Sequence, residues 1–273
     1  MLRRRGAILA KRRVSALALI ALAFAGSAQG SNRSLPWEGG PGLVTPFESK
    51  ASEVAATVSG RAVSVECNDG VSWRSLGSRL GFDSSKSWAV TPFHWDSALD
   101  RAAPDDVAHF SPRACRFGDA FWLAATEYGT RTCRVGVRNA RGVRVPAGPV
   151  LGECELWAPK LTAVHVLSHE SVHLHGFYGE AHAECLAVQI DAHVAVALGA
   201  EERFARSMAS EFWTDHYIPR SDAYRSVDCH DGGSLDLFPS LSGWPTPRRY
   251  PRDLHAALSA LESKVRLGGG GSP

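Results

Sequence analysis

One stretch of the chain combines residue types that can bind a metal ion and activate water. It reads His169-Glu170-Ser171-Val172-His173, in which two histidines flank a glutamate. On a helix, residues four apart lie on the same face, so both imidazoles can bind one zinc ion through their ring nitrogens. The intervening glutamate then lies beside the metal, where it can take a proton from zinc-bound water. Because zinc lowers the pKa of that water to about 7, the predicted chemistry is hydrolysis at neutral pH.

Sequence patterns around this motif predict the helices that position it. Residues 161–175 have a helical pattern, and Gly176 is a natural helix end because glycine adopts the left-handed conformation there. Three further helices are expected, over residues 180–198, 201–217 and 251–265. Glu180 and Glu184 lie four residues apart at the start of the next helix, so either can approach the two histidines.

These two helices resemble the zincin metallopeptidases, specifically the glutamate-zincin type, over about 25 of the 273 residues. In that group a downstream helix supplies a glutamate as the third zinc ligand, and an acid four residues later supports a ligand histidine. The resemblance implies a zinc ion held by His169, His173 and Glu180, with Glu184 in the supporting role. The whole pattern is also similar to small secreted bacterial zincin-like proteins of unknown substrate.

The short connection between the helices leaves an alternative open. In a tight antiparallel hairpin, the residue that faces the middle of the motif lies about five positions into the second helix, which favours Glu184 as the ligand. His165, one turn before the motif, is expected on the helix face or in support of a ligand. Candidates for stabilising an oxyanion are Tyr178 in the connection, and His216 and Tyr217 at the end of the third helix.

The first 30 residues predict export from the cytoplasm. They contain six basic residues and no acid, an apolar run over residues 14–25, and small residues over 26–28, which is typical of a secretory signal peptide. The run of 12 residues is shorter than the 20 or so that a spanning helix needs. An uncleaved signal that anchors the chain is the alternative, and no other membrane association is expected.

Export changes the interpretation of the cysteines. In an oxidising compartment, an even number of cysteines favours disulfides, and no pair has the two-residue gap of a zinc knuckle. Six cysteines allow 15 connectivities, among which a Cys185–Cys229 bond would tie a helix to the C-terminal loop. The candidates are Cys67, Cys115, Cys133, Cys154, Cys185 and Cys229.

Composition sets limits on the class of protein. With 44% hydrophobic and 21% charged residues in 273, the chain is long enough to form a substantial core. Beyond residue 30 it carries 24 basic and 28 acidic residues. A slightly acidic body gives no electrostatic reason to bind nucleic acid.

The expected fold class is α+β, with an irregular N-terminal α/β region and a helical, zincin-like C-terminal core. A helix over residues 49–59 and a strand over residues 61–67 are expected in the N-terminal region. The predicted divisions are a signal peptide over 1–30, a linker or arm over 31–50, an N-terminal α+β part over 51–150, the core over 151–265 and a flexible tail over 266–273.

The function expected from these features is that of an exported zinc metallopeptidase. Glu170 is the expected general base, and the substrate is an extracytoplasmic protein or peptide. The alternative is a non-catalytic exported binding or scaffold protein that keeps a structural or relic zinc site. A further option is that the arm over residues 31–50 inhibits the enzyme by lying across the zinc ion.

Overall fold

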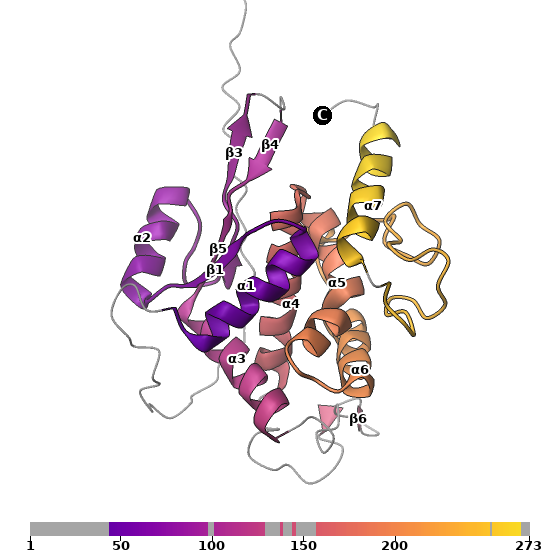
Figure 1. Ribbon diagram of the computed structural model, residues 1–273, viewed down its shortest axis with the longest axis horizontal. Helices are drawn as coiled ribbons and strands as arrows, with labels where there is room; N and C mark the ends of the chain where they lie inside the picture. The colour runs from indigo at the N-terminus through magenta and orange to yellow at the C-terminus, as the bar shows by residue number, and fades with distance from the viewer. Residues whose placement is uncertain are drawn as a thin grey trace, which may run out of the picture.

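The computed structural model describes residues 44–97, 101–128, 137–138, 144–145, 157–251 and 253–268. The predicted signal peptide, most of the predicted arm, Cys133 and Cys154 lie outside these residues. Within them the fold is α+β, as predicted, with several helices and a few short strands in small sheets (Figure 1). None of the described helices combines the length and apolar character needed to cross a bilayer.

The first described helix, α1 (Pro46–Ser59), begins three residues before the predicted start at residue 49. The Thr45 side chain accepts a hydrogen bond from the N–H of Glu48, and the Glu48 side chain accepts one from the N–H of Thr45. This capping box, with Pro46 in the first turn, fixes the helix start. The predicted linker therefore ends earlier than residue 50.

A small sheet and a separate hairpin form the strands of the N-terminal half. In the sheet, the central strand β5 (Val107–Phe110) pairs in parallel with β1 (Ser64–Cys67) and antiparallel with β2 (Ala89–Val90). The hairpin of β3 (Phe93–Asp96) and β4 (Arg101–Pro104) projects from the body of the molecule (Figure 1). The remaining elements of this half are α2 (Gly70–Leu80), α3 (Pro112–Leu123), a π-helical turn (Ala124–Tyr128) and the paired strands β6 (Val137–Arg138) and β7 (Arg144–Val145).

The centre of the molecule is α4 (Trp157–His175), which packs against α1, α3 and α5 (Glu180–Ala197). Every residue from 160 to 174 is buried, including charged or polar side chains such as Lys160, His165 and Glu170. The predicted third helix consists of α6 (Glu202–Phe212) followed by a π-helical turn (Trp213–Tyr217). A short 3-10 turn (Asp222–Tyr224) comes next along the chain.

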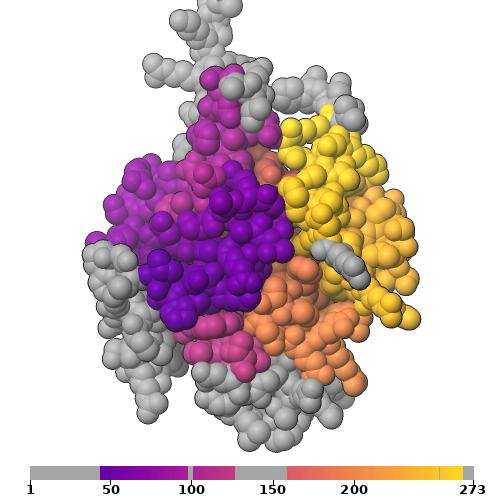
Figure 2. Space-filling model, viewed as in Figure 1, coloured from indigo at the N-terminus to yellow at the C-terminus, as the bar shows by residue number. Residues whose placement is uncertain are grey.

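The last helix, α7 (Leu254–Gly268), packs against α1, and the two lie side by side on the molecular surface (Figure 2). It begins at residue 254 rather than 251 because the Asp253 side chain accepts the N–H of Ala256 over 2.8 Å, as a helix cap does. It also continues past the predicted end at residue 265, where Arg266 pairs with Glu262 one turn earlier. The predicted tail therefore begins later than residue 266.

Two disulfides join described segments that are distant in sequence. The predicted Cys185–Cys229 bond is confirmed and ties α5 to the C-terminal loop. A second bond joins Cys67 at the end of β1 to Cys115 in α3. No cysteine in the described part of the chain is free. Such bonds are typical of proteins that fold in an oxidising compartment, in agreement with a location outside the cytoplasm.

Candidate metal centre

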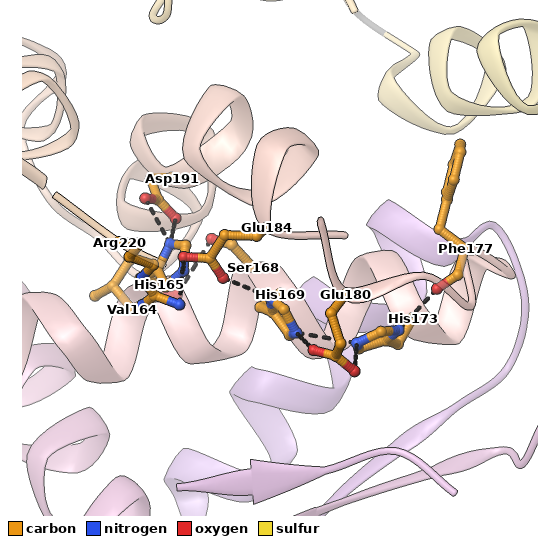
Figure 3. Close-up of polar contacts among 10 residues, drawn as sticks. All are labelled: Val164, His165, Ser168, His169, His173, Phe177, Glu180, Glu184, Asp191 and Arg220. Atoms are coloured by element: carbon orange, nitrogen blue, oxygen red, sulfur yellow. Dashed lines mark hydrogen bonds and ion pairs between the residues drawn. The ribbon is translucent and has the colours of Figure 1, made fainter. Parts of the chain in front are cut away.

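His169 and His173 approach the same point from consecutive turns of α4 (Figure 3). Their Nε2 atoms lie 2.9 Å apart, and both side chains are buried. Nδ1 of His173 lies 2.7 Å from the carbonyl oxygen of Phe177. Because a carbonyl oxygen can only accept a hydrogen bond, the proton of this ring is on Nδ1, and the Nε2 lone pair is free to bind a cation.

Glu180, in the first turn of α5, lies between the two histidines. Its Oε2 is 3.4 Å from Nε2 of His169, and its Oε1 is 3.6 Å from Nε2 of His173. Neither oxygen has a hydrogen-bond partner among the described residues, although both are shielded from solvent. Ligand atoms of the three side chains lie within 4.8 Å of one another, close enough to surround one ion.

The connection between α4 and α5 brings Glu180 to this position. Gly176 has a φ of 128°, in the left-handed region, and its N–H bonds back to the carbonyl oxygen of His173 over 2.9 Å. The carbonyl oxygen of Leu174 accepts a hydrogen bond from Nε of Arg61, which follows α1. The end of α4 is thus fixed both by its own turn and by the N-terminal half, so that α5 can start four residues later.

Glu184, one turn farther along α5, faces the other edge of His169. Its Oε2 lies 2.9 Å from Nδ1 of His169, and its Oε1 lies 2.7 Å from Nη1 of Arg220 and 3.1 Å from Nε2 of His165. A carboxylate in this position favours a proton on Nδ1 of His169, so that Nε2 is the nitrogen that remains for a cation. These distances favour the arrangement with Glu180 at the ligand nitrogens and Glu184 in support over the one with Glu184 as the ligand.

His165 and Asp191 continue this network behind His169. Nδ1 of His165 lies 3.0 Å from Oδ2 of Asp191, while its Nε2 faces Glu184. Burial alone lowers the pKa of His165, but Glu184 and Asp191 outweigh that effect and raise the pKa above its ordinary value. Ligand atoms of His165, His169 and Glu184 also lie within 4.8 Å of one another. A positive charge already lies beside this second group, because the Arg220 guanidinium contacts Glu184.

The electrostatics of the site favour positive charge on the ring of His169. Burial alone lowers the pKa of His169, but the contacts with Glu180 and Glu184 reverse this and raise it to about 10. Burial raises the pKa of Glu180, but His169 and His173 reverse this and lower it to about 2. Two imidazole nitrogens and a glutamate oxygen are the donor set of a known class of catalytic zinc sites, so the residues present fit zinc.

Glu170, next to His169 on α4, is fully buried. Its Oε2 accepts a hydrogen bond of 2.7 Å from the Thr91 hydroxyl, while its Oε1 has no hydrogen-bond partner in the described part of the chain. Burial raises the pKa of Glu170, and the neighbouring His173 and His169 lower it in part. A buried carboxylate with one free oxygen beside the candidate ligands has the properties of a proton acceptor.

Tyr178 lies in the connection between α4 and α5 and is 41% exposed. Its ring packs edge-on against Phe93 of β3, with ring centroids 5.0 Å apart. Phe93 packs in the same way against His173, at 5.6 Å. Phe93 therefore connects Tyr178 to His173, one of the candidate ligands.

Tyr217 and His216 lie on the His165 side of the site. The ring of His216 packs against Phe212, whose ring stacks on His165 with centroids 4.0 Å apart. The Tyr217 hydroxyl accepts the N–H of Ser226 over 3.3 Å, and burial raises its pKa. Through Phe212 and His165 the contacts of His216 lead to the ring of His169, whereas those of Tyr178 lead through Phe93 to the ring of His173.

The sequence interpretation missed three residues of this network: Thr91, Asp191 and Arg220. Asp191 had a signal, because it follows Glu184 by seven residues and therefore lies on the same face of α5. Thr91 and Arg220 come from segments far from the motif along the chain, and no local pattern marks either of them.

Comparison of the chain with models of known protein families, with curated proteins and with solved structures finds no match. The function is therefore argued from the geometry and chemistry of the site.

Proposed function

We propose that the chain is an exported zinc-dependent hydrolase that cleaves amide bonds in extracytoplasmic proteins or peptides, as a zincin metallopeptidase does. One observation carries this proposal. Nε2 of His169, Nε2 of His173 and the Glu180 carboxylate converge on a single point, and the contacts of the two Nδ1 atoms leave Nε2 of each ring as the nitrogen that faces a cation.

The charges around the site support a divalent cation. Besides Glu170 and Glu180, two further carboxylates contact the network, those of Glu184 and Asp191. The Arg220 guanidinium and a protonated His165 balance two of these four negative charges. A divalent cation at the Nε2 atoms balances the other two, which matters because unpaired buried charge is costly.

The proposed mechanism uses one carboxylate for both proton transfers. When bound, zinc supplies Lewis acidity that polarises an amide carbonyl and makes water easier to deprotonate. His169, His173 and Glu180 hold the ion. Oε1 of Glu170 takes a proton from the attacking water and then delivers it to the leaving nitrogen. Tyr178 is the candidate that we favour for stabilising the oxyanion, because its contacts lead through Phe93 to His173.

The second candidate function is a structural zinc site in a non-catalytic binding or scaffold protein. Burial favours it, since His169 is 0% and His173 1% exposed. Structural zinc sites are closed by four protein ligands, however, and the group formed by described residues offers three. A structural site also needs no proton acceptor such as the unpartnered Oε1 of Glu170, whereas a hydrolase does. We therefore prefer the hydrolase.

The decisive variant is Glu170→Gln in the zinc-loaded protein. It is expected to lower the cleavage of a quenched fluorescent peptide library by about 100- to 10,000-fold, since this is what a general base contributes. Zinc content, measured by mass spectrometry of the metal, should stay at the wild-type value. Glu53→Gln, on the exposed face of α1, is the matched control and should cleave at the wild-type rate.

Two results would change this conclusion. Wild-type cleavage by Glu170→Gln would remove the general-base role. A wild-type protein that binds zinc, cleaves no member of the library and unfolds when the zinc is chelated would instead support the structural site.

A further inference from the structure

Thr91 belongs to the N-terminal half, in the segment between β2 and β3. Pro92 follows it and restricts Thr91 to an extended backbone. The pairing of Ala89 and Val90 with β5 fixes the chain just before it, and the carbonyl oxygen of Pro92 accepts the N–H of Asp105 just after it. The position of this side chain is therefore set by the sheet rather than by the helix that carries the motif.

The Thr91 hydroxyl donates to Oε2 of Glu170 over 2.7 Å, across 79 residues of sequence. Both side chains are buried, at 2% and 0% exposure. A threonine hydroxyl has a single proton to donate, so it satisfies one carboxylate oxygen and leaves the other, Oε1, without a partner among the described residues. An unsatisfied buried carboxylate oxygen costs free energy, so the unpartnered Oε1 of Glu170 needs a physical or functional explanation.

We propose that Thr91 is a positioning residue for Glu170. By holding Oε2, its hydroxyl fixes the rotation of the carboxylate and aims Oε1 at the water that Glu170 deprotonates. The inference rests on the proposed hydrolase function and adds that a residue from the N-terminal half completes the catalytic arrangement.

A role in filling space makes a different prediction. A buried threonine that only packs tolerates valine, which has nearly the same shape without the hydroxyl, about as well as it tolerates serine. A positioning hydroxyl requires serine and rejects valine. The pair Thr91→Ser and Thr91→Val therefore separates the two roles, because both variants make small changes in volume.

The first test is steady-state cleavage of a fluorogenic peptide selected from the library, with zinc-loaded protein. Thr91→Val is expected to lower kcat by about ten- to a hundredfold with little change in KM, the size expected for a lost hydrogen bond to a charged group. Thr91→Ser should recover most of that loss. Thr57→Val removes an exposed hydroxyl from α1 and should match the wild type.

A double-mutant comparison tests whether Thr91 acts through Glu170. When Glu170 is already glutamine, adding Thr91→Val should lower the residual rate by less than twofold. If Glu170→Gln is inactive but Thr91→Val keeps the wild-type kcat, the positioning inference fails and the proposed function survives. If Glu170→Gln cleaves at the wild-type rate, the proposed function fails and the positioning inference fails with it.

The second test does not depend on activity. The carboxylate stretch of Glu170 is the infrared band that Glu170→Gln removes. In Thr91→Val the antisymmetric stretch should move to higher wavenumber, because a hydrogen bond to one oxygen is lost, and in Thr91→Ser it should stay in place. A band at the same wavenumber in all Thr91 variants would overturn the inference, as would a shifted band with an unchanged kcat.

Discussion

Two clusters between α4 and α5 both combine histidines with carboxylates but differ in their source of positive charge. The front cluster consists of His169, His173 and Glu180, and the rear cluster of His165, Glu184, Asp191 and Arg220. In the rear cluster, both ring nitrogens of His165 face carboxylates, and Glu184 also contacts a guanidinium. In the front cluster, the Glu180 oxygens face Nε2 of His169 and Nε2 of His173, at 3.4 and 3.6 Å.

This difference shows why spacing alone does not identify a metal site. Ligand atoms of His165, His169 and Glu184 lie within 4.8 Å of one another, as those of the front cluster do, so distance alone does not distinguish the two sides of His169. The source of positive charge separates them, because the rear cluster contains the guanidinium of Arg220, whereas the positive charge of the front cluster comes from a proton on His169 or from a bound cation. His169 belongs to both sides, with Nδ1 toward Glu184 and Nε2 toward Glu180. The rear cluster is therefore placed to orient a candidate ligand of the front one.

The largest expected effect comes from removing the cation of the rear cluster. Arg220→Met leaves the buried Glu184 without its guanidinium partner. It should lower the free energy of unfolding by about 3–5 kcal/mol, the usual cost of breaking a buried ion pair from one side. Urea unfolding of the zinc-free protein at pH 7 measures this change.

Lys86→Met is the matched control, since Lys86 forms an exposed pair with Asp83. Its effect should stay within about 0.5 kcal/mol. If Arg220→Met cost no more than the control, the protonated His165 would suffice to balance Glu184, and the distinction between the two clusters would be lost.

The opposite behaviour is expected of Glu180 in the front cluster. Glu180→Gln should weaken zinc binding at least about 100-fold, beyond the usual effect of changing a residue that only supports a ligand. The stability of the zinc-free protein should fall by less than in Arg220→Met, because the Glu180 side chain is 21% exposed and its contacts with His169 and His173 are longer, at 3.4 and 3.6 Å. Competition with a chelating dye measures the affinity, and Glu202→Gln on the exposed face of α6 is the control. Unchanged zinc affinity would move the ligand role to Glu184.

The part of the site that is local in sequence could be predicted. The motif, the glycine that ends α4 and the acids of α5 lie within 16 residues, so helical periodicity and one turn were enough to bring them together. The Cys185–Cys229 pairing also followed from the expectation of a helix tied to the loop after it. The start of α1 was missed although Thr45, Pro46 and Glu48 carry its signal, because the surrounding prolines and glycines suggested an irregular arm.

The contacts that complete the site depend on tertiary structure. Thr91 reaches Glu170 only because the small sheet packs against α4, and Arg220 reaches Glu184 only after the chain has passed α6 and turned back. A threonine before a proline and an arginine after one are common in loops. Such residues acquire a role from the long-range packing of the chain, which no local pattern encodes.

A fourth histidine of α4 extends the comparison and gives the smallest expected effect. His175 packs against Phe177 and His255, and its nearest carboxylate contact in the described part of the chain is with Glu262 at 3.9 Å. Burial, followed by repulsion from His255, lowers its pKa to about 4, with Arg61 acting in the same direction. The carboxylates beside His165 and His169 have the opposite effect on those two pKa values.

This shift makes stability depend on pH with a definite sign. Between pH 6.5 and pH 4 the unfolded chain binds a proton at His175 that the folded chain does not, so stability falls as the pH falls through this window. From pH 7 to pH 5, His175 should account for a loss of about 1 kcal/mol, allowing for partial solvent screening.

Urea unfolding of zinc-free wild type and His175→Phe at pH 7 and pH 5 measures this loss, because the variant should lose that much less stability. His230→Phe, at an exposed histidine, should behave as the wild type does. Equal losses of stability in wild type and His175→Phe would show that the pKa of His175 is not lowered in the folded protein. The absence of a close carboxylate would then not explain a difference between His175 and the pair His165 and His169.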